Sequence, residues 1–216
     1  MKIYSDFDEF FQKGKELGFL HENDELRLAK IKRLYSRYDV LNFFHKVLYY
    51  NTEYLSNIVE SYTNLINDLV KVSNSLFNPE NLLVEKFSIP ITDENELIEI
   101  KKGKNSEFKR EVLLNNEKYY LSKDKDEAIG VKIEFNINEK KYQCVFCQET
   151  KLIELKYLEL VNQIFKDLNL DDRFYLDNEI TDYTSIVLFM TQKQAKKLDE
   201  QELLKVKLPQ RRTIIF

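Results

Sequence analysis

Residues 19–78 read FLHENDELRLAKIKRLYSRYDVLNFFHKVLYYNTEYLSNIVESYTNLINDLVKVSNSLFN, and this run contains neither glycine nor proline. Glycine frees φ, and proline fixes φ and removes a hydrogen-bond donor, so the two residues interrupt most chains built from short elements. Their absence over so long a run predicts that much of the first third of the chain is helical. A helix of that length favours a role in association.

A seven-residue pattern supports the helical interpretation from residue 31 onward. One seam is apolar at every step and comprises Leu34, Leu41, Leu48, Leu55, Tyr62, Leu69 and Leu76. The partner seam is polar or small at several steps, and further apolar residues lie off the seam between positions 40 and 50. A helix that is apolar on so much of its circumference packs on several sides. We therefore predict one very long helix, or two helices broken near Asn51–Thr52, packed within a domain; a free-standing coiled coil is the alternative.

Asn78–Pro79 ends the predicted helical region, because the residue before a proline avoids helical backbone angles. The composition changes after this point. With a short first helix that starts at Ser5–Asp6 and ends at Gly18, we predict a helical region over residues 1–78 and an α+β domain over 79–216. The fold class is α+β, with long N-terminal helices followed by an antiparallel β-sheet and two C-terminal helices. The strands are predicted at 87–91, 96–100, 111–121, 131–137, 142–147, 173–175 and 185–190, and the helices at 152–168 and from Thr191 to about Val206, where Thr191 and Gln194 match a capping box.

Composition and charge limit the protein class. The chain has 216 residues with 15 Phe and 13 Tyr, which excludes wholesale disorder. Its formal net charge is −4, so it shows no global bias toward nucleic acid or anionic membranes. No apolar run is long enough to span a membrane, and the N-terminus lacks the apolar core of a secretory signal. We expect a cytoplasmic protein without a membrane partner.

The chemical motifs are few. Cys144-x-x-Cys147 lies within a predicted strand, where residues three apart point to opposite faces, and no second ligand pair accompanies it as a zinc site requires. His45 falls on the helical seam, where a packed register-fixing role is favoured over that of a catalytic base. Four glycines leave no room for a P-loop or a dinucleotide fingerprint. We expect no enzyme, no cofactor and no metal, although catalysis by carboxylates alone stays open.

An acidic segment near the C-terminus is the candidate contact surface. Crowded carboxylates on a loop stay solvated or meet a basic partner, and aromatic residues among them are typical anchors of a protein interface. The predicted partner-binding residues are Asp171, Asp172, Tyr175, Asp177, Glu179, Asp182 and Tyr183.

Two other interpretations compete with this surface. A basic stripe at the start of the long segment suggests phosphate contacts with nucleic acid, as in a phage-defence accessory protein, and comprises Arg27, Lys30, Arg33 and Arg37. A solvated face that offsets nearby acidic residues explains the same stripe. The long helix alternatively predicts an oligomerisation scaffold, with a homodimer formed through that helix.

From about Gly130 to Val206 the order is hairpin, amphipathic helix, RFYLDNE, a strand SIVLFMT and then QKQAKKL. In this element order and these segments the chain resembles the small α+β immunity proteins that protect bacteria from polymorphic toxins. The resemblance implies a cytoplasmic antitoxin that binds and neutralises a toxin domain, often a basic nuclease, without catalysis of its own. It assigns no functional residue.

Overall fold

The computed structural model describes residues 7–20, 46–51, 57–91, 97–102, 105–115, 117–122, 127–148, 156–177, 184–201 and 204–209. The chain groups into two compact units that are interleaved in sequence. Unit 1 takes Met1–Asn51, Asp68–Phe77 and Val161–Pro209, and unit 2 takes Thr52–Asn67, Asn78–Leu160 and Gln210–Phe216. This grouping describes packing and does not test the predicted division into residues 1–78 and 79–216, which stays a prediction.

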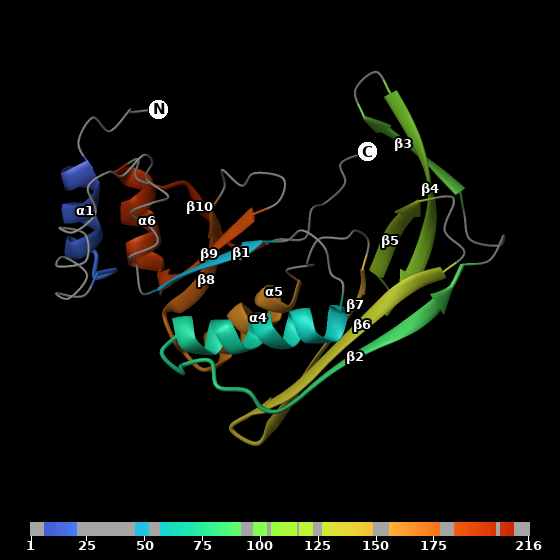
Figure 1. Cartoon of the computed structure of the whole chain (residues 1–216), viewed down its shortest axis with the longest axis horizontal. Coiled ribbons are helices and arrows are strands. Elements are labelled where there is room, and N and C mark those ends of the chain that lie inside the picture. Colours follow the sequence, from blue (N-terminus) through green and yellow to red (C-terminus); the bar gives the residue numbers. More distant parts are fainter. Residues whose placement is uncertain are drawn as a thin grey trace. The chain divides into compact units, whose positions relative to one another are not determined.

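Unit 1 is built on a four-stranded antiparallel sheet (Figure 1). The strands are β1 (Val47–Asn51), β8 (Asp172–Asp177), β9 (Thr184–Thr191) and β10 (Val206–Lys207), in the order β1-β9-β8-β10. Its helical residues belong to α1 (Phe7–Glu16), α6 (Gln192–Glu200), the larger part of α5 (Lys156–Asp167) and the end of α4 (Ile58–Val72).

Helices and chain segments cover both faces of this sheet. On one face four aromatic rings pack together, Phe77, Phe165, Phe174 and Phe189, with centroids 4.9–6.5 Å apart. The intervening strand residues Tyr175, Leu188 and Met190 face a second cluster that includes residues of α6 and of the segment after α1. Burial on both faces explains why the β9 sequence is a continuous apolar run and not an alternating one.

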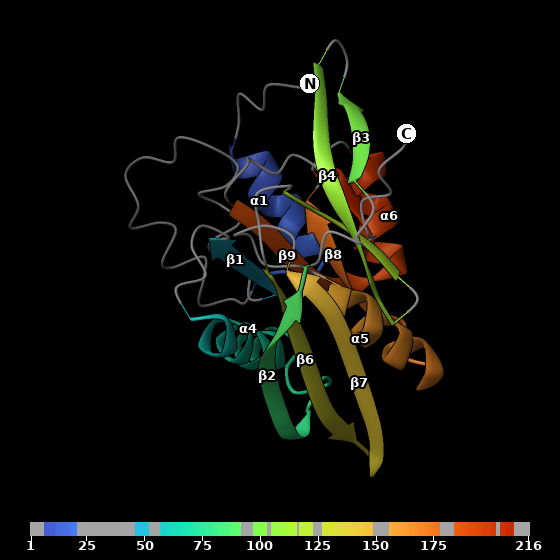
Figure 2. The same ribbon diagram turned by 90° about the vertical axis from the view of Figure 1, so that its right-hand side faces the viewer.

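Unit 2 contains a three-stranded sheet of long strands, seen side by side in Figure 2. These are β2 (Glu80–Pro90), β6 (Glu127–Ile137) and β7 (Lys140–Gln148), in the order β2-β6-β7. The alternating side chains Val131, Ile133 and Phe135 are buried on one face of β6. The first part of α4 (Ile58–Val72) contributes Tyr62, whose hydroxyl donates a 2.7 Å hydrogen bond to Gln148 of β7.

The opposite face of this sheet carries a charged network. Lys132 lies 2.6 Å from Glu134 and 3.4 Å from Glu85, and Lys141 lies 2.6 Å from Glu134. The hydrogen bond with Glu134 raises the pKa of Lys132, and the same bond lowers the pKa of Glu134. These pairs stay in contact with solvent, so they add little stability, but they align the three strands on their outer face.

A second sheet in unit 2 is a meander of β3 (Leu97–Lys102), β4 (Asn105–Leu114) and β5 (Glu117–Ser122). Val112, Tyr119 and Leu121 are buried on one of its faces. The prediction of a single strand over 111–121 was wrong, because the chain reverses at Asn115, which adopts φ 51°. Asn tolerates this left-handed conformation and often marks a tight turn.

The prediction of long N-terminal helices was also wrong. Residues Val47–Asn51 form β1, which pairs with β9 from Val47 opposite Leu188 to Asn51 opposite Thr184. A run without glycine or proline is compatible with a strand, and the valine and two tyrosines of β1 are residue types enriched in strands. Residues 21–45, with Leu34 and Leu41 of the predicted seam, lie outside the described part of the chain. The described residues contain three sheets and more strand than helix.

The helical prediction was right for α4 and for the C-terminal elements. Asn57 caps α4 by accepting a hydrogen bond from the Glu60 amide. Tyr62 and Leu69 of the apolar seam and Ile66 of its partner seam are buried. The β6–β7 hairpin, α5, β8 and β9 lie where the sequence patterns predicted them. The last helix ends at Glu200, short of the predicted Val206, which belongs to β10. None of the helices in the described ranges has the length and apolar character to cross a membrane.

Candidate functional site

The acidic segment predicted from sequence begins at the turn between α5 and β8. Asp167 ends α5 and is exposed, and it accepts a 2.7 Å hydrogen bond from Gln163. Asp171 is exposed in the turn. Asp172 opens β8, is half-buried, and lies 4.0 Å from the ammonium group of Lys46. Three carboxylates therefore gather at one end of the β8 strand.

The turn that carries these carboxylates is held on both sides. Asn169 adopts φ 57°, and the amide of Leu170 donates to the Phe165 carbonyl, which closes the end of α5. The side-chain amide of Asn162 both accepts from and donates to the backbone of Phe174, at 2.8 and 2.9 Å. The positions of Asp171 and Asp172 are therefore set by the backbone of a braced turn.

Arg173 is the one arginine in this segment, and its guanidinium group points to the backbone. It donates to the carbonyl oxygens of Leu170 and Asp172, the second at 2.6 Å. A cation that donates hydrogen bonds to carbonyl groups near the C-terminus of a helix interacts favourably with the negative end of the helix dipole. The guanidinium is thus engaged by the backbone of the turn, beside the aspartates.

The remaining predicted contact residues are not at this surface. Tyr175 is 7% exposed and packs in the core of unit 1, and Asp177 is fully buried. Burial raises the pKa of the Tyr175 phenol. Because the sheet is covered on both faces, successive residues of β8 are buried whichever face they point to. The many polar residues in this segment suggested an exposed loop and did not reveal this burial. Glu179, Asp182 and Tyr183 lie outside the described ranges, as do Arg27, Lys30, Arg33 and Arg37.

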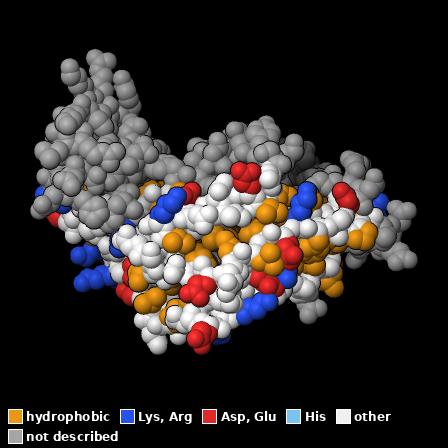
Figure 3. Space-filling model, turned by 60° about the horizontal axis from the view of Figure 1, so that its bottom comes forward, with side chains coloured by type: hydrophobic (Ala, Val, Ile, Leu, Met, Phe, Trp, Pro, Cys, Tyr) orange, Lys and Arg blue, Asp and Glu red, His pale blue; other side chains and the backbone are white. Residues whose placement is uncertain are grey.

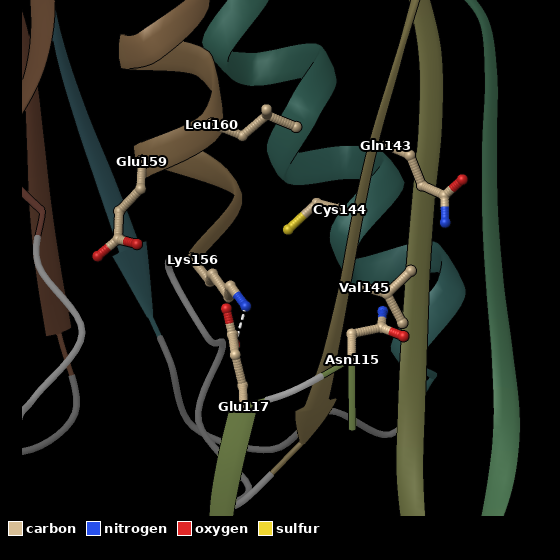
Figure 4. A pocket seen from close by; sticks show the side chains of 8 residues that line it. All are labelled: Asn115, Glu117, Gln143, Cys144, Val145, Lys156, Glu159 and Leu160. Atoms are coloured by element: carbon tan, nitrogen blue, oxygen red, sulfur yellow. Dashed lines mark hydrogen bonds and ion pairs between the residues drawn. The ribbon is translucent and has the colours of Figure 1, made fainter. Parts of the chain in front are cut away.

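A pocket of about 290 Å³ in unit 2 was not predicted from the sequence (Figure 4). It lies where the turn before β5, strand β7 and the start of α5 meet. The lining residues are Asn115, Glu117, Gln143, Cys144, Val145, Lys156, Glu159 and Leu160. Residues far apart in sequence converge here, so no local spacing could have identified them.

The polar centre of the pocket is an ion pair between Lys156 and Glu117. Tyr119 donates a 2.9 Å hydrogen bond to the same carboxylate, and the Lys156 ammonium lies 3.4 Å from the Tyr119 hydroxyl oxygen. The ammonium also lies 6.0 Å from the centroid of the Tyr119 ring. This trio ties the start of α5 to β5, and it offers a ligand mixed donors and acceptors.

Cys144 forms part of the pocket wall and points into it (Figure 4). Burial raises the pKa of its thiol to about 11, opposed by Lys156 and assisted by Glu117 and Glu159. The group is therefore a neutral thiol near pH 7 and is neither a nucleophile nor a strong metal ligand. Cys147 is buried on the opposite face, and neither cysteine forms a disulfide. The described residues contain no cluster of three or more His, Cys, Asp or Glu that could hold a metal.

On the face drawn in Figure 3, hydrophobic side chains are dispersed among acidic and basic ones.

Comparison with protein-family models, with curated proteins and with solved structures found no match to this chain.

Proposed function

We propose that this chain is a non-catalytic binding protein of the immunity or antitoxin kind, which captures a basic toxin domain through the turn between α5 and β8. The observation that carries the proposal is the arrangement of charge in that turn. Asp167, Asp171 and Asp172 gather there, while the guanidinium of Arg173 is turned onto backbone carbonyls. The turn therefore presents carboxylates from a braced backbone.

A preformed acidic turn is suited to a basic partner for two reasons. Complementary charge accelerates encounter and selects against acidic partners. A braced turn loses little conformational freedom when it binds, so less of the interaction energy is offset by ordering. The acidic net charge of −4 acts in the same direction. A cytoplasmic location, where a toxin nuclease would act, fits this proposal.

The test uses the product of the neighbouring reading frame, expressed as a catalytically inactive domain if it is a basic toxin. Its affinity for this chain is measured by calorimetry over a series of salt concentrations. Asp167→Lys combined with Asp171→Lys should weaken binding by about tenfold or more and flatten the salt dependence. Asp172 is left intact, because its reversal would also disturb Lys46.

The matched control reverses the same number of charges elsewhere in unit 1. Asp199 and Glu200 are exposed on α6, and Asp199→Lys with Glu200→Lys should leave the affinity within about twofold, since neither residue belongs to the turn and exposed charges are screened by salt. An equal loss of affinity in both double variants would mean that only net charge matters, and it would contradict the proposal. So would unchanged affinity after reversal at the turn, or the absence of a basic partner.

A further inference from the structure

Strand β2 is an edge strand with an unusually open environment. Among the described residues it pairs only with β6, and no described strand lies along its other edge (Figure 2). Residues 85–88 are exposed in succession, which means that both faces of the strand are open there as well as its edge. Long open edges are templates for pairing with another chain.

Two large apolar side chains are exposed on this strand. Leu83 is 42% and Phe87 37% exposed, and both share a face with Glu85, which lies between them. Their register partners on β6 are Glu134, Lys132 and Gly130. Because Gly130 has no Cβ, the Phe87 ring lies directly against it, with ring atoms 2.3–2.7 Å from where a Cβ would be. The Phe87 ring therefore leans over β6, while its backbone stays on the edge strand.

We propose that β2 pairs antiparallel with β2 of a second copy of this chain, about a two-fold axis at Glu85. A two-fold axis perpendicular to the sheet places each residue and its copy on the same face. Directly opposed residues also point to the same face, so the two numbers of an opposed pair must both be odd or both be even, and their sum is even. The register centred on Glu85 places Leu83 of each copy directly opposite Phe87 of the other. Two cross-strand apolar pairs then cover the side chains that a single copy leaves exposed.

Alternative registers are less favourable for reasons visible in the strand. Centring on Lys86 would place Glu85 opposite Phe87 and the two Lys86 side chains opposite each other. Centring on Glu85 also brings two like charges together, but each Glu85 has the ammonium of Lys132 3.4 Å away, which offsets the repulsion. Like charges opposite each other without such a partner are destabilising.

The ends of β2 limit the pairing to its middle. Pro90 lacks an amide donor, and the register with β6 is irregular between Glu80 and Leu83, where Asn81 adopts φ 53°. Such features normally blunt an edge strand. In the register centred on Glu85 they lie at or beyond the ends of the segment 82–88, so they restrict the pairing to this segment without preventing it. The inference concerns unit 2 and is independent of the proposed toxin partner.

Disulfide trapping tests the register directly. In Glu85→Cys the two introduced thiols face each other across the axis, within the range that a disulfide spans. Mild oxidation should therefore convert this variant to a covalent dimer about tenfold or more faster than Lys86→Cys, whose thiols are offset along the strands. The native cysteines are buried, so the unmodified chain provides the blank. Equal rates, or faster trapping of Lys86→Cys, would overturn the register.

Sedimentation over a concentration series tests the association itself. The unmodified chain should dimerise reversibly, and Leu83→Lys combined with Phe87→Lys should remain monomeric. Its circular-dichroism spectrum is recorded beside that of the unmodified chain to show that the variant is folded. Leu113 on β4 is 62% exposed, so Leu113→Lys is the control and should dimerise like the unmodified chain. A monomer at every concentration, or equal loss of dimer in the control, would overturn the proposal.

Discussion

Cys144 and Cys147 show at the scale of single residues how far spacing alone can be trusted. The spacing of three along a strand predicts opposite faces, and the structure places the two thiols on opposite faces of β7. The pocket around Cys144 was not predictable, because Lys156 and Glu117 reach it from other elements. Chemistry at this residue is therefore decided by neighbours that are distant in sequence.

Cys144 should make the stability of the fold depend on pH in the alkaline range. Burial raises the pKa of its thiol to about 11 in the folded chain, against a reference value of 9.0. Below pH 9 the thiol is therefore protonated in both the folded and the unfolded chain, and its contribution to stability is fully present. Between pH 9 and 11 the unfolded chain ionises first, and stability falls by about 2 kcal/mol. The free energy of unfolding, measured by denaturant titration, should therefore fall more steeply for the unmodified chain than for Cys144→Ala. Parallel curves would contradict the assignment.

Helix α6 shows what a local signal achieves at the scale of an element. The sequence predicted a capping box, and the structure contains it: Thr191 accepts from the Gln194 amide at 3.2 Å, and the Gln194 side chain accepts from the Thr191 amide at 2.9 Å. The Gln194 amide group also donates to the carbonyl of Leu17. One residue thus caps α6 and links it to the segment that follows α1.

Removing this cap should destabilise the chain measurably. Thr191→Ala leaves an amide at the start of α6 without its side-chain acceptor, which costs about 1 kcal/mol in the free energy of unfolding. Thr191→Ser keeps the hydroxyl and should recover most of the loss. Gln192→Ala, at an exposed position in the first turn, serves as the control and should change stability by less than about 0.5 kcal/mol. The cap would be unimportant if Thr191→Ala and Gln192→Ala were equally stable.

The elements that the sequence predicted correctly are those with a strong local period or cap. The alternation in β6, the helical spacing of Tyr62, Ile66 and Leu69, and the box at Thr191 all act between near neighbours in the chain. Strand β1 was missed because its apolar residues fit a helix seam as well as a strand, and β9 decided between the two. The contact role predicted for Tyr175 did not foresee its burial, because local polarity does not show that a strand is covered on both faces.

At the scale of the whole molecule, two units are built from interleaved segments. Helices α4 and α5 each contribute residues to both units. A helix forms cooperatively, since its hydrogen bonds depend on consecutive turns. The two units should therefore unfold together.

Matched core substitutions test this cooperativity. Ile186 is buried in unit 1 and Ile133 in unit 2, and replacing either by Val should cost about 0.5–1.5 kcal/mol. Both variants should shift the midpoint of the same single denaturant transition, with far- and near-ultraviolet circular dichroism coinciding. Two separated transitions, each moved by only one of the variants, would show that the units unfold independently.

The sequence by itself determined the local conformations that follow from spacing over a few residues: the β6–β7 hairpin, the amphipathic helices α4 and α5, and the cap of α6. Only the tertiary structure decided that β1 joins β9, that Tyr175 is buried, and that Glu117, Cys144 and Lys156 line one pocket. The physical reason is range. Periodicity and capping act between near neighbours, whereas strand partners, burial on two faces and convergent side chains depend on residues that the chain brings together only when it folds.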